Sequence, residues 1–174
     1  MKSHRAIIIV VIACLISSCD SNKKELGEAV KALQQVDSAT SVGTNISNYA
    51  TQLTSAKTEV DAYLLKDSNS ERAKKIDKLL NRHLAALSWW QCNLSQAESS
   101  LKDEYEVASE CRDAVLPKIF ELFPGIKQDA EQAITNKPRK YKSESLDKSA
   151  VLQFMWEETS IDTKSLLEDA NGLK

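Results

Sequence analysis

The sequence of 174 residues has little of what most fold classes other than helical bundles require. It contains only four glycines and three prolines, and aromatic residues make up 6% of the chain. This shortage excludes collagen-like and low-complexity chains and argues against an all-β fold, whose many turns use glycine and proline. The 23 basic and 25 acidic residues nearly balance, so net charge gives no reason to expect nucleic acid as a partner. These absences leave a helical globular domain.

The N-terminus differs in composition from everything that follows. Lys2, His4 and Arg5 precede eleven consecutive apolar residues, Ala6 to Ile16. This run is shorter than the ~20 residues that a membrane-spanning helix needs. A short positive region followed by such a run is typical of a signal peptide.

The end of the apolar run carries a recognisable motif. The residues Leu15-Ile16-Ser17-Ser18-Cys19 resemble the lipobox of bacterial lipoproteins. In that family the signal peptide is cut before the cysteine, whose thiol receives a diacylglycerol, and the new amine is often acylated, commonly with palmitate. The resemblance implies a signal peptide over residues 1–18 and firm attachment of Cys19 to a membrane, because two or three acyl chains hold a protein where one does not. An ordinary signal peptide or an uncleaved anchor is the alternative.

Asp20, directly after that cysteine, bears on the choice of membrane. An aspartate there resembles the signal that keeps enteric-type lipoproteins in the inner membrane. We therefore expect a periplasmic protein anchored by lipid, with the inner membrane favoured and the outer membrane left open.

Processing before Cys19 would leave 156 residues, 21 of them basic and 25 acidic. We expect a polar tether over residues 19–25 and a single domain over residues 26–174. Cys14 would leave with the signal peptide and Cys19 would carry lipid. Cys92 and Cys111 then remain as one possible disulfide in the oxidising periplasm, the alternative being two buried thiols.

Apolar spacing predicts an all-α bundle of five or six helices. The strongest pattern follows Ser68-Asn69-Ser70-Glu71, which resembles a capping box, and repeats at intervals of three and four residues. Its members are Ala73, Ile76, Leu80, His83, Leu87, Trp90 and Leu94. Weaker helical patterns occupy residues 26–36, 46–64, 111–123, 126–134 and 151–166, with a break expected over residues 38–43.

The repeat can be continued to Val115, which conflicts with the disulfide. On one unbroken helix, Cys92 and Cys111 would lie ~28 Å apart at 1.5 Å per residue. A disulfide needs Cα atoms within ~7 Å of each other. We therefore favour a helix break near residues 93–100, where asparagine and serines are frequent.

Two tryptophans are candidates for binding a partner. Trp89 lies off the stripe that contains Trp90, so it either packs against a second helix or lies exposed as an anchor for another protein. Trp156 lies on the last helical pattern, whose large side chains spread around the helix. Both readings remain open for both residues.

A basic segment is the candidate for contact with a membrane surface. Lys137, Arg139, Lys140 and Lys142 lie within six residues and could meet anionic headgroups. A solvated loop is the alternative.

We expect neither enzymatic activity nor a cofactor or metal. His83 is the only histidine after residue 18 and lies among leucines, so a structural role is favoured over ligation of metal or haem. No nucleophile, phosphate-binding glycine loop or zinc spacing can be assembled. The expected function is protein–protein interaction at the envelope, as an adaptor, accessory subunit or immunity-type inhibitor. The alternative is a helical module that binds an apolar or envelope-derived small ligand between its helices.

Overall fold

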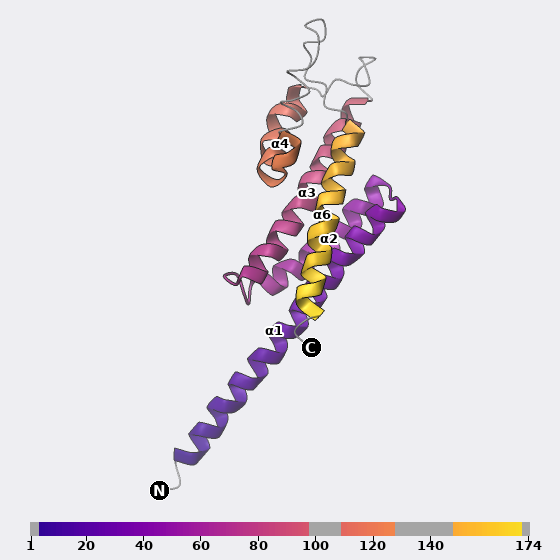
Figure 1. Cartoon of the computed structure of the whole chain (residues 1–174). Coiled ribbons are helices and arrows are strands. Elements are labelled where there is room, and N and C mark those ends of the chain that lie inside the picture. The colour runs from indigo at the N-terminus through magenta and orange to yellow at the C-terminus, as the bar shows by residue number, and fades with distance from the viewer. Residues whose placement is uncertain (1–3, 98–108, 128–147, 172–174) are drawn as a thin grey trace, which may run out of the picture.

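The protein is an all-α bundle (Figure 1). The computed structural model describes residues 4–97, 109–127 and 148–171, with side chains for residues 22–94, 114–127 and 149–169. Its helices are α1 (His4–Val42), α2 (Ile46–Leu64), α3 (Glu71–Ala97), α4 (Ser109–Leu122) and α6 (Lys148–Asn171). None of the residues in these ranges lies in a strand, and the expected fold class is confirmed.

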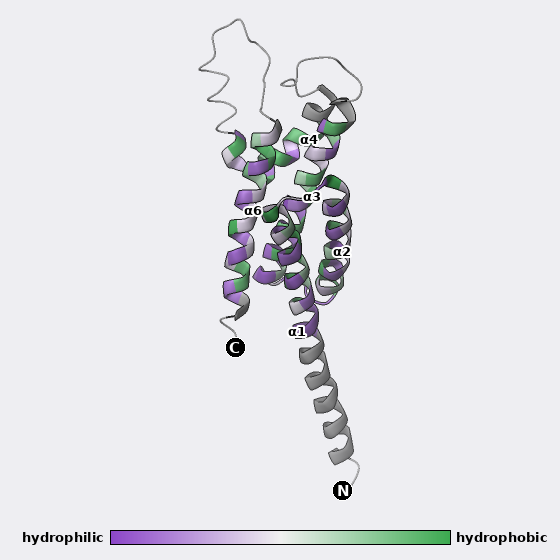
Figure 2. Ribbon diagram, turned by 90° about the vertical axis from the view of Figure 1, so that its right-hand side faces the viewer, coloured by the Kyte–Doolittle hydropathy of each residue, from purple (hydrophilic) through white to green (hydrophobic). Residues whose placement is uncertain are grey.

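The central helix is α3, which packs against α1, α2, α4 and α6. The helices α1 and α2 form a hairpin, and α6 packs against both α3 and α1. Hydrophilic and hydrophobic residues alternate along these helices, as expected for amphipathic segments (Figure 2). Because α3 has neighbours on several sides, it is buried on more than the single stripe that its repeat predicts.

Local chemistry sets where the helices begin and end. The break between α1 and α2 falls at Gly43, whose φ of 88° is accessible to glycine at little cost. The side chain of Asn45 then caps α2 by accepting the amide of Asn48 at 2.9 Å. Ser70 caps α3 in the same way through the amide of Ala73 at 3.0 Å, so the cap lies two residues later than a capping box on Ser68 predicts.

The interior nearest the α2–α3 turn is an aliphatic cluster shared by α1, α2, α3 and α6. Burial of these side chains removes apolar surface from water at ~25 cal/mol per Å² and is the main source of stability here. The buried members are Ala29, Val30, Leu33, Leu53, Val60, Tyr63, Ala73, Ile76, Leu79, Leu80 and Leu166.

A second cluster, here called the α4 cluster, joins α3, α4 and α6. Its buried members are Ala85, Ala86, Trp89, Leu116, Ile119, Phe123, Ile126, Val151 and Met155. The helices α3 and α4 therefore pack against each other, which one continuous helix could not do. Cys92 and Cys111 therefore lie on separate helices as expected, but α3 continues to Ala97, so residues 93–97 of the expected break are helical.

The segment that follows the lipobox motif is helical. The helix α1 is continuous from His4 to Val42 and includes residues 19–25, the expected tether. Glu25 forms an ion pair with Lys66 at the end of α2, and Leu26 packs against the aliphatic cluster. In the part of the chain that the structure describes with side chains, no helix is both long and apolar enough to cross a membrane.

Candidate functional site

Further along the same four helices, the aliphatic cluster gives way to a polar-aromatic layer formed by Asp37, Tyr49, His83, Trp90 and Trp156. Asp37 comes from α1, Tyr49 from α2, His83 and Trp90 from α3, and Trp156 from α6. The side chains of Tyr49 and His83 are fully enclosed, with 0% and 1% exposure.

Tyr49 and His83 form the central contact of this layer. The Tyr49 hydroxyl lies 3.0 Å from Nδ1 of His83 and 3.2 Å from the backbone carbonyl oxygen of the same residue. The hydroxyl has one proton, which it donates either to Nδ1 or to the carbonyl oxygen. In the second case Nδ1–H donates to the hydroxyl, so the two residues remain bonded in either tautomer.

Two tryptophan rings, those of Trp90 and Trp156, pack against Tyr49 of this pair. The ring centroids of Tyr49 and Trp90 lie 6.1 Å apart, those of Tyr49 and Trp156 5.8 Å, and those of Trp90 and Trp156 5.4 Å. These are distances of direct ring contact. The rings therefore pack against one another and do not form an open cage in which a cation could sit.

Several polar atoms in or beside the layer are buried without a hydrogen-bond partner. They include Nε2 of His83, Oδ1 of Asp37, Oε1 of Gln52 and Nε1 of Trp156. Unpaired buried groups cost about 1–3 kcal/mol each in folded proteins. The layer is therefore stabilised less per buried residue than the aliphatic cluster.

Burial dominates the electrostatics of the layer. It lowers the pKa of His83 to about 4, because the enclosed site disfavours the imidazolium. It raises the pKa of the Tyr49 phenol for the same reason, opposed by the Trp156 indole. Burial also raises the pKa of Asp37, while the hydroxyl of Ser160, 3.2 Å from its Oδ2, acts in the opposite direction. At neutral pH His83 and Tyr49 are both uncharged.

This chemistry suits a structural layer better than a catalytic centre. An imidazole bonded to a phenol can relay a proton, but a relay needs a reacting group within hydrogen-bond reach. Both side chains are closed off from solvent. Among the residues described with side chains, no group of three or more potential ligands could hold a metal ion.

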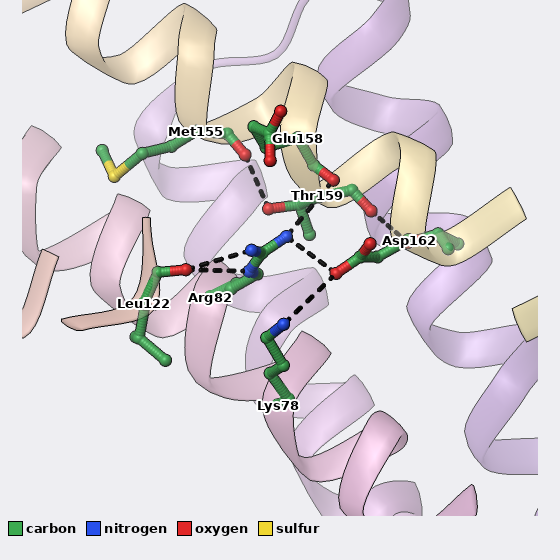
Figure 3. Close-up of polar contacts among 8 residues, drawn as sticks. Lys78, Arg82, Leu122, Met155, Glu158, Thr159 and Asp162 are labelled. Atoms are coloured by element: carbon green, nitrogen blue, oxygen red, sulfur yellow. Dashed lines mark hydrogen bonds and ion pairs between the residues drawn. The ribbon is translucent and has the colours of Figure 1, made fainter. Parts of the chain in front are cut away.

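Arg82, which precedes His83 in the sequence, forms a second group of polar contacts that joins α3 to α4 and α6 (Figure 3). The buried guanidinium donates through Nε and Nη2 to the carbonyl oxygen of Leu122 at 3.2 and 3.0 Å, at the end of α4. Its Nη1 donates to Oδ2 of Asp162 at 2.8 Å and to the Glu158 carbonyl oxygen at 3.4 Å. The guanidinium carbon also lies 4.8 Å from the Phe123 ring centroid. Arg82 satisfies the Leu122 carbonyl oxygen at the end of α4, where the carbonyls of a helix have no intrahelical partners.

The structure corrects one predicted site residue. Trp89 is 0% exposed and lies in the α4 cluster, so of its two readings packing against other helices is right and the partner anchor is wrong. The packing of α4 and α6 on that face of α3 covers it. Trp156 is only partly buried, and it contacts Tyr49 and Trp90 within the chain.

Of the other predicted site residues, the structure describes the side chain of Cys92 but not those of Cys19 and Cys111. Cys92 is partly buried near the end of α3, and Cys111 belongs to the first turns of α4. The basic segment with Lys137, Arg139, Lys140 and Lys142 falls outside the described residues altogether. Anchoring, the disulfide and membrane contact by this segment all stay predictions.

Sequence reasoning missed the roles of Tyr49 and Arg82. Tyr49 was one member of an apolar pattern, and nothing local names its partner 34 residues away. Arg82 did carry a signal, because it continues a second stripe on α3. That stripe consists of Leu79, Arg82, Ala86 and Trp89, all buried.

Comparison with known proteins adds no relative. No family model, no curated protein and no solved structure matches the chain.

Proposed function

We propose that the protein is a lipoprotein of the bacterial envelope, held at the periplasmic face of a membrane through Cys19 and acting by contact with another protein. The order of features at the N-terminus carries the proposal: two basic residues, an apolar run too short to span a membrane, two serines and a cysteine. Asp20 favours the inner membrane.

Contact with a protein is supported by apolar side chains on the surface of the described residues. Val42, Leu65, Leu94 and Ile161 are large apolar residues with 84%, 88%, 45% and 62% of their surface exposed. Leu94 continues the stripe of α3 that includes His83 and Trp90, beyond the part covered by Tyr49. The fully buried core of a protein interface is more apolar than its rim, so these side chains suit the core of a contact with another protein.

A disulfide between Cys92 and Cys111 belongs to the same proposal. Arg82 of α3 binds the carbonyl of Leu122 in α4, and the two helices run in opposite directions (Figure 1). Both helices rise about 1.5 Å per residue. Ten residues after Arg82 on α3 therefore lie at the same level as ten residues before Leu122 on α4, which places Cys92 level with Arg112. Cys111 is the neighbour of Arg112. The register therefore supports the pairing, and loss of both thiol hydrogens, detected by mass spectrometry of the isolated protein, would verify it.

The anchor is tested by mass spectrometry of the membrane fraction. We expect the wild-type protein to lack residues 1–18 and to carry a diacylglycerol on Cys19, and the Cys19→Ser variant to keep its full length without lipid. Cys14→Ser is the matched control, because it removes a cysteine from the apolar run and leaves the lipobox intact. Wild-type protein with an unmodified Cys19 would refute the anchor.

The contact with a protein is tested by a photo-crosslinking side chain placed at position 94 in intact envelopes. We expect one discrete protein adduct from position 94 and none from the control position 57, which is exposed and polar. Absence of an adduct from position 94 and from the other three exposed apolar positions would refute interaction through the described surface.

A further inference from the structure

We propose that the protein opens locally at acid pH. Uptake of a proton by His83 separates the tip of the α1–α2 hairpin, residues 36–52, from α3 and α6 while the aliphatic cluster stays closed. This inference concerns regulation and does not depend on the lipid anchor. It rests on the position of one titratable group at one end of an interface between four helices.

The location of His83 is the first observation. Its ring is fully enclosed where α2 crosses α3, and its one side-chain bond joins the two helices through Tyr49. Its Nε2 has no partner. An imidazolium must donate from both nitrogens, so protonation in the closed state would leave a buried charge with an unpaired N–H.

The groups around His83 do not offset such a charge. Among the described residues, α2 contributes the uncharged phenol of Tyr49, and α1 contributes Asp37, which is bound to Ser160 of α6. Burial alone accounts for the lowered pKa of His83, to about 4, with no contribution from a neighbouring carboxylate. The remaining charges of α3 and α6 nearby are directed elsewhere: Arg82 and Lys78 contact Asp162, on the side of α4 and α6, and Lys164 acts on Asp37.

The hairpin tip is also the part best able to move. It carries two buried oxygens without a hydrogen-bond partner, Oδ1 of Asp37, whose other oxygen contacts Ser160 of α6, and Oε1 of Gln52, so its closed state contains unmet hydrogen bonds. The connecting residues 43–45 are outside the helices and exposed or partly exposed. At the other end the same helices meet through the aliphatic cluster, which contains Tyr63 as its only titratable buried member. Local opening of the weaker end is the expected response.

The size of the effect follows from linkage. If His83 regains a pKa of ~6.5 when it is exposed and has about 4 when it is closed in, lowering the pH from 7 to 5 favours the open form by about 20-fold. Opening exposes Tyr49, Trp90 and Trp156 together.

Amide hydrogen exchange of the full-length protein at pH 7 and pH 5, corrected for the intrinsic rate at each pH, tests this segment by segment. We expect protection over residues 36–52 to fall by about 20-fold at pH 5 and protection over residues 57–64 and 73–80 to change by less than about 2-fold. An equal loss in both regions, or no loss in either, would overturn the proposal.

Two variants identify the titrating group. In His83→Gln, which keeps a polar side chain without a titrating group, we expect protection over residues 36–52 to be the same at both pH values. Asp37→Asn is the control and should retain the pH dependence. Burial raises the pKa of Asp37, so protonation of Asp37 at lower pH favours the closed form, whereas protonation of His83 favours the open form. If the pH dependence of protection survives in His83→Gln, or disappears in Asp37→Asn, the proposal is contradicted.

A measurement on the wild-type protein covers the case in which His83→Gln does not fold. The imidazole resonances of His83 should titrate with a midpoint well below 6.5, and protection should fall steadily from pH ~6.5 down to that midpoint. A midpoint near 6.5 without change in protection would show that His83 is exposed at all pH values and would end the idea.

Discussion

In the aliphatic cluster, α1, α2, α3 and α6 meet through side chains such as Leu33 and Ile76, whose only requirement is contact. Further along the same helices they meet through Tyr49, His83 and Trp156, whose polar atoms require partners and only partly find them. The two regions therefore differ in what can disturb them. The first responds to lost volume, and the second responds to lost hydrogen bonds and to pH.

The largest effect is expected from a cavity in the aliphatic cluster. Ile76→Ala removes buried volume from a residue with 0% exposure, and we expect a loss of about 2–5 kcal/mol in the free energy of unfolding, measured by denaturant titration. Ile161→Ala is the matched control, because Ile161 is 62% exposed and its truncation should cost less than about 0.5 kcal/mol. Equal losses in both variants would show that the cluster is not the main source of stability.

The next effect separates the two regions by pH. Burial lowers the pKa of His83 to about 4, so between pH ~6.5 and pH ~4 the unfolded chain binds more protons than the folded one. Stability that is complete above pH ~6.5 is therefore lost as the pH falls toward 4, by about 3 kcal/mol from this group. The difference between wild type and His83→Gln, measured across this range, isolates the effect of His83 from that of the carboxylates. A constant difference would contradict the assigned pKa.

Arg82 sharpens the comparison, because it is a buried charge whose partners are complete. Arg82→Met keeps most of the volume but leaves the Leu122 carbonyl without its donors, and we expect a loss of about 2 kcal/mol. Arg82→Lys should not restore this, since a lysine cannot donate in the planar fork that reaches both Leu122 and Asp162. Hydrogen exchange should show the loss first in α4. Full rescue by lysine would mean that charge alone, and not the geometry of the guanidinium, holds α4.

The aliphatic cluster could be predicted from the sequence to a greater extent than the polar-aromatic layer. The spacing of Ala73, Ile76 and Leu80 identifies one buried face of α3 because helical periodicity is a local property. The second buried face and the burial of Trp89 depend on where α4 packs, which no local pattern states. The α1 helix also runs past the expected break to Val42, with the hydroxyls of Ser38, Thr40 and Ser41 bonded to backbone carbonyls one turn earlier.

The polar contacts were beyond prediction for a related reason. A sequence pattern marked His83 as a core residue, but its partner depends on the register between α2 and α3, which is set by packing across the whole interface. Arg82 was overlooked because arginine is rarely buried. In both cases the residue type was visible and the pairing was not.

The smallest effect tests whether the Tyr49–His83 hydrogen bond adds to the free energy of unfolding, or whether the Tyr49 ring alone stabilises the layer. Tyr49→Phe keeps the ring and its contacts with Trp90 and Trp156 but removes the hydroxyl that lies 3.0 Å from Nδ1 of His83. We expect a loss of about 1 kcal/mol, the net value of one hydrogen bond, measured by denaturant titration at pH 7. Because His83 then has no side-chain partner, the same variant should also make the hairpin tip easier to open at neutral pH, visible as lower protection over residues 36–52. An unchanged stability would mean that the hydroxyl contributes nothing net, and that the aromatic contacts alone hold this end of the bundle. The polar-aromatic layer would then differ from the aliphatic cluster only in that its stability depends on pH.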